Sequence, residues 1–209
     1  MKTVALLLLS LITTSCIESQ NRTNDTARVG DPCESCEAIY EYGDKYLNAV
    51  DTIQSFRKLG TPIKVSGRVL KKDGKTPVSD VILYIYHTDD KGIYPKSSSP
   101  RGWERQHGYL RTWLKTDKDG NYTLYTSRPA SYPNSSVPQH IHITVKEPNL
   151  NEYYVEDFYF ADDPNITRNI LNRTNARGGS GVIQLKQNGD LWEAERDIIL
   201  GLNIPNYPN

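Results

Sequence analysis

The sequence of 209 residues predicts an all-β fold, an antiparallel β-sandwich of about eight strands. From residue 63 onward, short runs rich in β-branched and aromatic residues alternate with clusters of Gly, Pro, Asn and Asp, as strands alternate with turns. The expected strands are 63–70, 81–88, 109–116, 122–127, 139–146, 153–160, 181–187 and 192–200. The connection 162–181 has room for one short helix, and residues 37–59 carry apolar side chains at spacings that fit one helical face.

The first 15 residues predict an export signal. Lys2 precedes an apolar stretch, 4–12, which is shorter than the roughly 20 residues of a membrane span. Small residues then lead directly to Cys16, as in a bacterial lipobox. We therefore expect cleavage before Cys16 and a lipid anchor on it, so that membrane contact comes only through the lipid. Export to the periplasm or the cell surface follows, with ordinary secretion as the alternative.

The domain division that we expect has three parts. Residues 1–15 form the signal peptide, 16–36 a lipidated flexible tether, and 37–209 one sandwich domain. The 25 Lys and Arg residues balance the 25 Asp and Glu residues, and no basic run stands out, which argues against nucleic acid as a partner. Cys33 and Cys36 form an even pair in an oxidising compartment, so a structural disulfide is expected, while a redox pair or half a zinc site remain alternatives.

Two histidines and two tyrosines are the candidate metal ligands. His140 and His142 stand two residues apart in an expected strand, so both side chains point to the same face. Tyr94 follows the strand 81–88, and Tyr132 follows the strand 122–127. If successive strands run up and down, both tyrosines and the start of the histidine strand reach the same end of the sandwich. Two imidazoles and two phenolates suit a hard, high-valent metal, and non-haem Fe(III) is the natural candidate.

The stretch from Gly67 to Ile143 resembles the intradiol ring-cleavage dioxygenases, and among them the compact protocatechuate 3,4-dioxygenase type. The matching segments are 67–69, Pro77, 81–86, 92–94, 110–112, 116–122, 128–129, 132–133 and 138–142, with weaker likeness at 158–160 and 196–200. The resemblance implies that Tyr94 and His140 bind ferric iron in the equatorial plane, and that Tyr132 and His142 bind it axially.

The resemblance also implies the chemistry. A catechol-type small molecule would chelate the iron, displacing Tyr132, which is therefore also a catalytic residue, and O₂ would open the ring to a muconate-type diacid. Three positions depart from the family pattern: Val137 stands where an arginine is expected, Asn134 where a tryptophan is expected, and Asp157 where a glutamine is expected. Arg101, Arg105 and Arg111 are candidates to replace the missing arginine. An oligomer is left open.

Other residues and motifs of the chain have interpretations of their own. His87 and His107 have no partner pattern and are expected not to bind metal. Glu147 would complete part of a cupin-like motif with the histidines, but it lies five residues beyond His142, on the opposite face of an unbroken strand. The run 117–120 is expected to be a hairpin turn and not a calcium loop. The alternative function is a surface lipoprotein that keeps the sandwich and binds metal or ligand without turnover, which Val137 favours.

Overall fold

The structure, a computed structural model, describes residues 28–208, and its regular elements are twelve short strands and four short helices. The strands are β1 (Val50–Thr52), β2 (Pro62–Leu70), β3 (Ile82–Tyr86), β4 (Arg111–Lys115), β5 (Asn121–Ser127), β6 (His140–Lys146), β7 (Tyr153–Tyr154), β8 (Phe158–Phe160), β9 (Val182–Ile183), β10 (Lys186–Asn188), β11 (Leu191–Glu195) and β12 (Ile198–Ile199). The helices are the 3₁₀ turns η1 (Cys36–Tyr40) and η2 (Phe56–Lys58) and the short α-helices α1 (Glu104–His107) and α2 (Arg168–Leu171).

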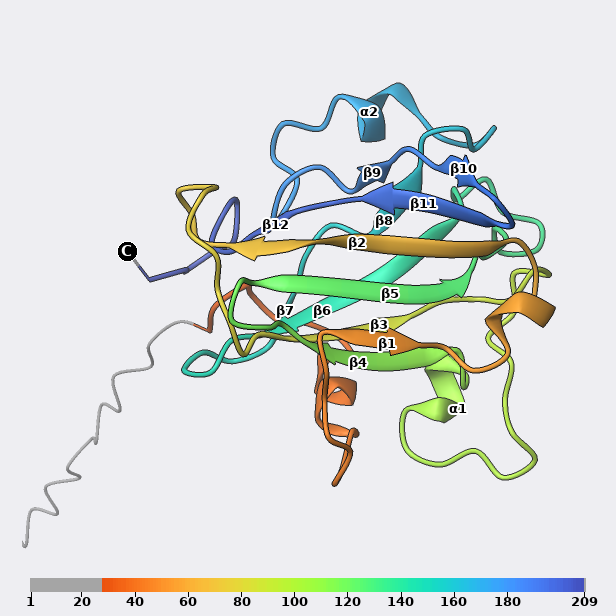
Figure 1. Ribbon diagram of the computed structural model, residues 1–209, viewed down its shortest axis with the longest axis horizontal. Helices are drawn as coiled ribbons and strands as arrows, with labels where there is room; N and C mark the ends of the chain where they lie inside the picture. Colours follow the sequence, from red (N-terminus) through yellow and green to blue (C-terminus); the bar gives the residue numbers. More distant parts are fainter. Residues whose placement is uncertain (1–27, 209) are drawn as a thin grey trace, which may run out of the picture.

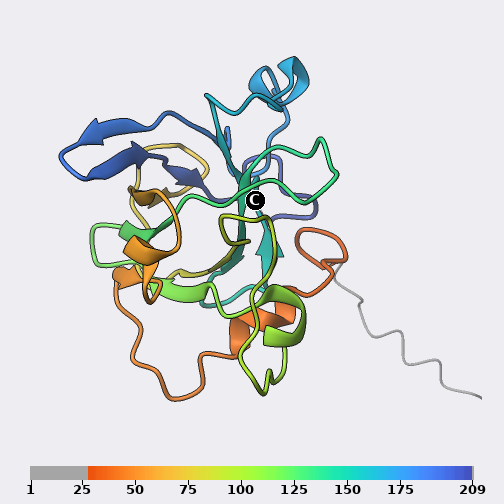
Figure 2. The ribbon, with the colours of Figure 1, turned by 90° about the vertical axis from the view of Figure 1, so that its right-hand side faces the viewer.

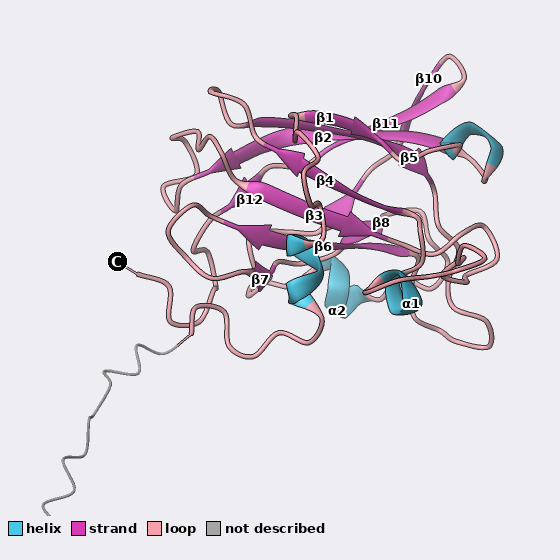
Figure 3. Cartoon of the chain, turned by 90° about the horizontal axis from the view of Figure 1, so that it is seen from below, coloured by secondary structure: helices cyan, strands magenta, loops and turns pink. Residues whose placement is uncertain are grey.

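The strands form two packed sheets, which confirms the predicted all-β sandwich (Figure 1). One sheet has the order β1-β5-β2-β11-β10, with β12 pairing with β2, and the other has the order β4-β3-β6-β8-β9, with β7 pairing with β6. Seen from below in Figure 3, the two sheets lie as layers, with β1, β2, β5 and β11 above β3 and β6. Most pairs are antiparallel, but β1 pairs in parallel with β5, β11 and β12 pair in parallel with β2, and β9 pairs in parallel with β8.

Three of the expected strands are each interrupted, which explains why the strands outnumber the prediction. The run 153–160 becomes β7 and β8 because the amide of Glu156 donates to Arg177 O instead of joining the ladder. The run 192–200 becomes β11 and β12 where the Asp197 carboxylate accepts from the amide of Arg68. In both cases a polar contact replaces one step of the sheet. The third run, 181–187, becomes β9 and the start of β10, and β1 is a further strand that was not expected.

The core lies between the sheets, and the strand period of two decides which side chains enter it. On β6, Ile141, Ile143 and Val145 are buried in the main core cluster. The alternate residues His140 and His142 therefore point to the outer face of the second sheet. The candidate ligands thus lie outside the apolar core, on a strand that the core holds rigidly.

The N-terminal part of the described chain covers this outer face. Ala38, Ile39 and Leu47 pack on Tyr84 of β3 and Trp113 of β4 in a second, smaller core cluster. The single helix expected over 37–59 does not form: the chain makes η1, then β1 and η2. The reason is that its apolar residues serve two surfaces, the cluster under η1 and, through Ile53, the main core.

The packed chain also begins earlier than the expected domain boundary at residue 37. Val29 and Gly30 are buried, and the amide of Gly30 donates to Pro205 O at 2.8 Å. Arg28 pairs with the Glu152 carboxylate. Residues 28–36 are therefore part of the folded domain. The predicted signal peptide, Cys16 and most of the predicted tether lie outside the described residues. Among residues 28–208, no helix has the length and apolar character to cross a membrane.

Candidate metal centre

Two loops and the start of β6 meet at one end of the sandwich, the end that faces the viewer in Figure 2. The strand β3 is antiparallel to β6, with Tyr86 opposite His142, so the loop after β3 leaves beside the histidines. The turn 117–120 is not a hairpin within one sheet, because β4 and β5 belong to different sheets. It still reverses the chain, and the loop after β5 therefore reaches the same end.

Gly92 lies at the contact between the loop that carries Tyr94 and the loop that carries Tyr132. It adopts a positive φ of 77°, and a Cβ there would lie 1.9 Å from Ser131 O, the residue before Tyr132. Asp89 O also accepts from the amides of Gly92 and Ala130, at 3.2 and 2.9 Å. Only glycine permits this approach of two backbones, so the contact sets the spacing between Tyr94 and Tyr132.

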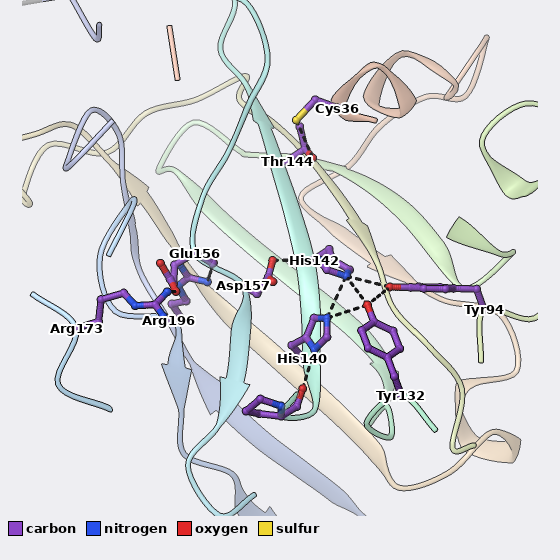
Figure 4. Close-up of polar contacts among 11 residues, drawn as sticks. Cys36, Tyr94, Tyr132, His140, His142, Thr144, Glu156, Asp157, Arg173 and Arg196 are labelled. Atoms are coloured by element: carbon purple, nitrogen blue, oxygen red, sulfur yellow. Dashed lines mark hydrogen bonds and ion pairs between the residues drawn. The ribbon is translucent and has the colours of Figure 1, made fainter. Parts of the chain in front are cut away.

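The four predicted ligands come together with their donor atoms facing one another (Figure 4). Tyr94 Oη lies 2.7 Å from Tyr132 Oη and 3.0 Å from His142 Nε2. Tyr132 Oη lies 3.1 Å from His140 Nε2 and 3.3 Å from His142 Nε2. The two Nε2 atoms are 3.1 Å apart. The structure therefore brings together the whole candidate set that the sequence predicts.

These separations fit a single metal ion. Two donors at about 2.0–2.1 Å from a common ion, at angles between a right angle and tetrahedral, lie about 2.8–3.4 Å apart, and the observed contacts span 2.7 to 3.3 Å. Four protein donors leave a further position for a substrate. The donor set of two imidazole nitrogens and two phenol oxygens matches a hard, high-valent ion.

Backbone and carboxylate acceptors fix which nitrogen of each histidine faces the centre. His140 Nδ1 donates to Pro138 O at 2.7 Å, and because a carbonyl only accepts, Nδ1 carries the proton. His142 Nδ1 lies 3.2 Å from Asp157 Oδ1, which holds it in the same tautomer. Both Nε2 lone pairs are then free for a metal. The acceptor of His140 is local, two residues earlier in the chain, whereas Asp157 lies beyond β7 and could not be identified as the partner of His142 from the sequence.

Burial favours the neutral forms of His140, Tyr94 and Tyr132. It lowers the pKa of His140, with a further lowering from His142. Burial also raises the pKa of Tyr94 and of Tyr132, so both remain phenols unless a cation is present. A bound cation reverses this preference and holds the two oxygens as phenolates. The two tyrosine oxygens therefore become anionic only when a cation binds.

Asp157 supports His142 and is not itself placed to bind the same ion. His140, His142 and Asp157 could form a three-ligand site by proximity, but the carboxylate contacts Nδ1 of His142, while the four-atom cluster uses Nε2. Burial would raise the pKa of Asp157, yet His142 and then His140 lower it, so it stays ionised. A carboxylate on the far nitrogen orients the imidazole and makes it a stronger ligand.

Two arginines that the sequence did not single out hold the surrounding backbone. Arg196 is buried, donates to Glu156 O at 2.6 Å and stacks on Phe158, beside Asp157. Arg128 donates to Gln139 Oε1 at 2.7 Å and makes two contacts of 2.9 Å to Asp162, which fixes the turn that leads into β6. The sequence holds no signal for this role of Arg196, because it stands between two other charged residues, Glu195 and Asp197.

The remaining sequence candidates lie elsewhere. His87 is buried with Nε2 against Thr126 Oγ1, and His107 Nδ1 contacts Tyr84 Oη at 2.8 Å, so neither joins the cluster. Glu147 accepts from the hydroxyls of Tyr153 and Tyr207. It therefore serves the opposite end of β6, as the strand period predicts.

None of the three arginines considered as replacements is held at the centre. Arg111 pairs with Glu41 at 2.6 Å and stacks on Trp113, Arg105 donates to Pro100 O, and Arg101 is exposed. Val137, where the family pattern has its arginine, is exposed. Cys33 and Cys36 are joined in a disulfide, as expected, and Cys36 Sγ lies 3.7 Å from Thr144 Oγ1, two residues from His142.

Comparison with known families gives a match over residues 40–188 to the family described as Dioxygenase. The chain belongs to the intradiol dioxygenase family. This confirms the resemblance found in the sequence, and it places the protein in a family of oxidoreductases that use O₂. The match spans well over half the chain and includes all four residues of the candidate centre.

Solved structures of other family members share the fold. The dioxygenase domain of a dioxygenase–carbohydrate-binding fusion protein from Streptomyces sp. SirexAA-E aligns with a TM-score of 0.55 at 22% identity, covering 77% of this chain and 94% of that one. Hydroxyquinol 1,2-dioxygenase from Pseudomonas putida DLL-E4 aligns with a TM-score of 0.53 at 19% identity, covering 75% of this chain and 62% of that one. Catechol 1,2-dioxygenase from Acinetobacter sp. ADP1 aligns with a TM-score of 0.55 at 19% identity, covering 80% of this chain and 64% of that one.

At these identities the likeness establishes the fold alone. The chain also spans less than two thirds of the hydroxyquinol and catechol enzymes. Comparison with curated proteins gave no match. The activity of this intradiol dioxygenase family member has therefore to be argued from its own residues.

The Gly92 contact predicts a large effect of one added methyl group. Gly92→Ala should lower the free energy of unfolding by about 2–4 kcal/mol, since a left-handed alanine costs about 1–2 kcal/mol and the overlap with Ser131 O adds to it. Gly43→Ala is the matched control, because Gly43 also has a positive φ but nothing lies within 4 Å of its Cβ position. Chemical denaturation of both variants checks this; equal losses would contradict the role assigned to Gly92.

The contact between Asp157 and His142 predicts a loss of metal affinity. Asp157→Ala should weaken ferric iron binding by about 10–100-fold, as expected when the partner of a ligating histidine is removed. Asp157→Asn keeps an acceptor and should lose less. Competition with a chelator, followed by visible absorbance, measures both, with Asp119→Ala in an exposed turn as the control. An unchanged affinity in Asp157→Ala would show that Asp157 does not orient the ligand.

Proposed function

We propose that this protein is a non-haem Fe(III) intradiol dioxygenase that cleaves a catechol-type ring between its two hydroxyl-bearing carbons, using O₂, to a muconate-type diacid. The observation that carries the proposal is the cluster of Tyr94, Tyr132, His140 and His142, whose donor atoms approach one another within 2.7–3.3 Å. Membership of the intradiol family supports it.

The residues fit ferric iron by their chemistry. His140 and His142 both turn Nε2 toward the centre, and the two phenols become phenolates beside a cation. When bound, ferric iron would supply a Lewis-acid centre that holds both oxygens of the catechol and promotes reaction of the ring with O₂.

The protein's own residues have separate tasks in this reaction. His140, His142 and Tyr94 hold the geometry, since His140 and His142 are each fixed through the other ring nitrogen and Tyr94 is fixed through the Gly92 contact. Tyr132 directly precedes an exposed turn in which Asn134 has a positive φ of 57°. We assign it the mobile role: as a phenolate it would leave its position when the catechol enters and take up one catechol proton, while the second proton would pass to solvent.

The alternative is a surface protein that binds iron and catechol but does not turn over. Val137 favours it, because loss of a pre-organised cation can cost about 3 kcal/mol of transition-state stabilisation, or roughly 10²-fold in rate. None of the three arginines considered above is held at the centre. The two functions share the metal site and differ in whether the ring is consumed.

The visible absorbance of the iron-loaded protein, measured first without oxygen and then in air, distinguishes the enzyme from the binding protein. The iron-loaded domain should show a tyrosinate-to-iron colour that shifts when catechol is added and reverts in air as a diacid product accumulates. Tyr94→Phe and Tyr132→Phe should each weaken or shift the colour, whereas Tyr109→Phe, at an exposed tyrosine, should not. A shifted colour that persists in air would favour the binding protein, and a colourless protein with added Fe(III) would contradict both functions.

We further propose that the protein is exported and anchored through a lipid on Cys16, with aromatic compound catabolism taking place outside the cytoplasm. The lipobox-like sequence before Cys16 supports this. In a bacterial host, the full-length chain should fractionate with membranes, and Cys16→Ser should move it to the soluble fraction. Ser15→Ala is the control, because small residues are accepted at that position. Membrane association that survives Cys16→Ser would contradict the anchor.

A further inference from the structure

The disulfide turn lies beside the far side of His142, where the ring nitrogen Nδ1 meets Asp157. A cavity of about 260 Å³ separates the turn from the second sheet, and Cys33 and Cys36 line it together with His142 and Asp157. Figure 4 shows Cys36 in contact with Thr144, on the same strand as His142. The disulfide is therefore part of the enclosure around the contact between Asp157 and His142.

This disulfide contributes little as a structural staple. Its two cysteines are only 3 residues apart in the sequence, and a cross-link removes the least entropy from the unfolded chain when the loop is short. The segment is also held on both sides of the turn. Before it, the amide of Gly30 donates to Pro205 O at 2.8 Å, and after it, Ala38 and Ile39 are buried. Opening the disulfide would therefore free the turn between these anchors and leave the domain folded.

The two cysteines differ in exposure, which gives thiol–disulfide exchange a direction. Cys33 is partly exposed, so a thiolate from solvent can reach it, whereas Cys36 is only 2% exposed. Cys36 Sγ lies 3.7 Å from Thr144 Oγ1, and because a disulfide sulfur carries no proton, the threonine hydroxyl is the donor. The same hydroxyl would stabilise a thiolate at Cys36. Attack at Cys33, with Cys36 as the leaving group, is therefore the favoured course.

We propose that Cys33–Cys36 is a redox-active disulfide that exchanges with a dithiol, and that its oxidised form tightens iron binding by closing the wall beside Asp157. One thiolate of the dithiol attacks Cys33 Sγ, the Cys33–Cys36 bond breaks, and its electron pair leaves on Cys36, which takes up a proton. The second thiolate attacks the mixed disulfide and releases Cys33, which also takes up a proton. The dithiol loses two electrons as it forms its own disulfide, and the protein gains them.

The link from the disulfide to the metal runs through Asp157. Its carboxylate lies 3.2 Å from His142 Nδ1 and orients that ring, and the oxidised turn limits the water that would compete for the carboxylate. A reduced turn is free to move away from the cavity, so Asp157 becomes better hydrated and holds His142 less firmly. This link rests on the proposed function, because it takes His142 as an iron ligand, whereas the exchange at Cys33 does not.

Thiol trapping tests the exchange in a Cys16→Ser chain, in which Cys33 and Cys36 are the only cysteines. Dithiothreitol without denaturant should yield two alkylated thiols by mass spectrometry while the circular dichroism stays native. On the same background, Cys36→Ser leaves the exposed thiol and Cys33→Ser leaves the buried one. The first should form a mixed disulfide with oxidised glutathione roughly tenfold faster than the second. Thiols that appear only on unfolding, or equal rates in the two variants, would overturn the proposal and leave a structural disulfide.

Iron affinity tests the link to the metal with no reductant present. Chelator competition compares the Cys16→Ser chain with the same chain carrying Cys33→Ser and Cys36→Ser. Loss of the disulfide should weaken ferric iron binding by about three- to ten-fold, less than the roughly 10–100-fold expected when Asp157 itself is lost. In an Asp157→Ala background it should have no further effect.

Two results would overturn the link: equal iron affinity with and without the disulfide, or the same loss of affinity in the Asp157→Ala background. If the chain binds no iron in either form, the proposed function fails, and the exchange at Cys33 is decided by the thiol measurements alone.

Discussion

The alternation of side chains along β6 is the constraint on which the site depends. Ile141 and Ile143 are anchored in the core between the sheets, and this fixes His140 and His142 on the opposite face with their rings only 3.1 Å apart at Nε2. A slip of one residue in register would put both histidines into the apolar core. The pairing of β6 with β3 and β8 prevents that slip, so the packing of the core and the geometry of the centre are one property of the fold.

Segments outside β6 supply the other residues of the site. Tyr94 and Tyr132 come from connections that lie far apart in the sequence, and the close approach of Gly92 to Ser131 O links them. Asp157 reaches the centre because the sheet is interrupted between β7 and β8, where Arg196 holds the carbonyl of Glu156. The outer face of the second sheet is covered by the N-terminal segment from Cys33 to Leu47, which forms a wall beside the site.

Much of this could be predicted from the sequence, and the reasons are physical. The sandwich and the convergence of the four ligands follow from local patterns, namely the strand period and the turn residues, which do not depend on distant contacts. The alternating directions of β3, β4 and β6 were predicted correctly. The chain also reverses between β4 and β5, although they lie in different sheets, because a tight turn reverses the chain in either arrangement.

The parts that could not be predicted depend on contacts between distant segments. Residues 37–59 have a helical pattern, but Ile53 packs into the main core and Leu47 into the cluster over Tyr84, so no single helix can satisfy both. The acceptor of His142, Asp157 Oδ1, and the packing of residues 28–36 likewise follow from tertiary structure. Crystallography of the iron-loaded protein with anomalous data at the iron edge tests the central claim most directly. The account predicts one peak bonded to Tyr94, Tyr132, His140 and His142; an ion bound by His140, His142 and Asp157 instead would contradict it.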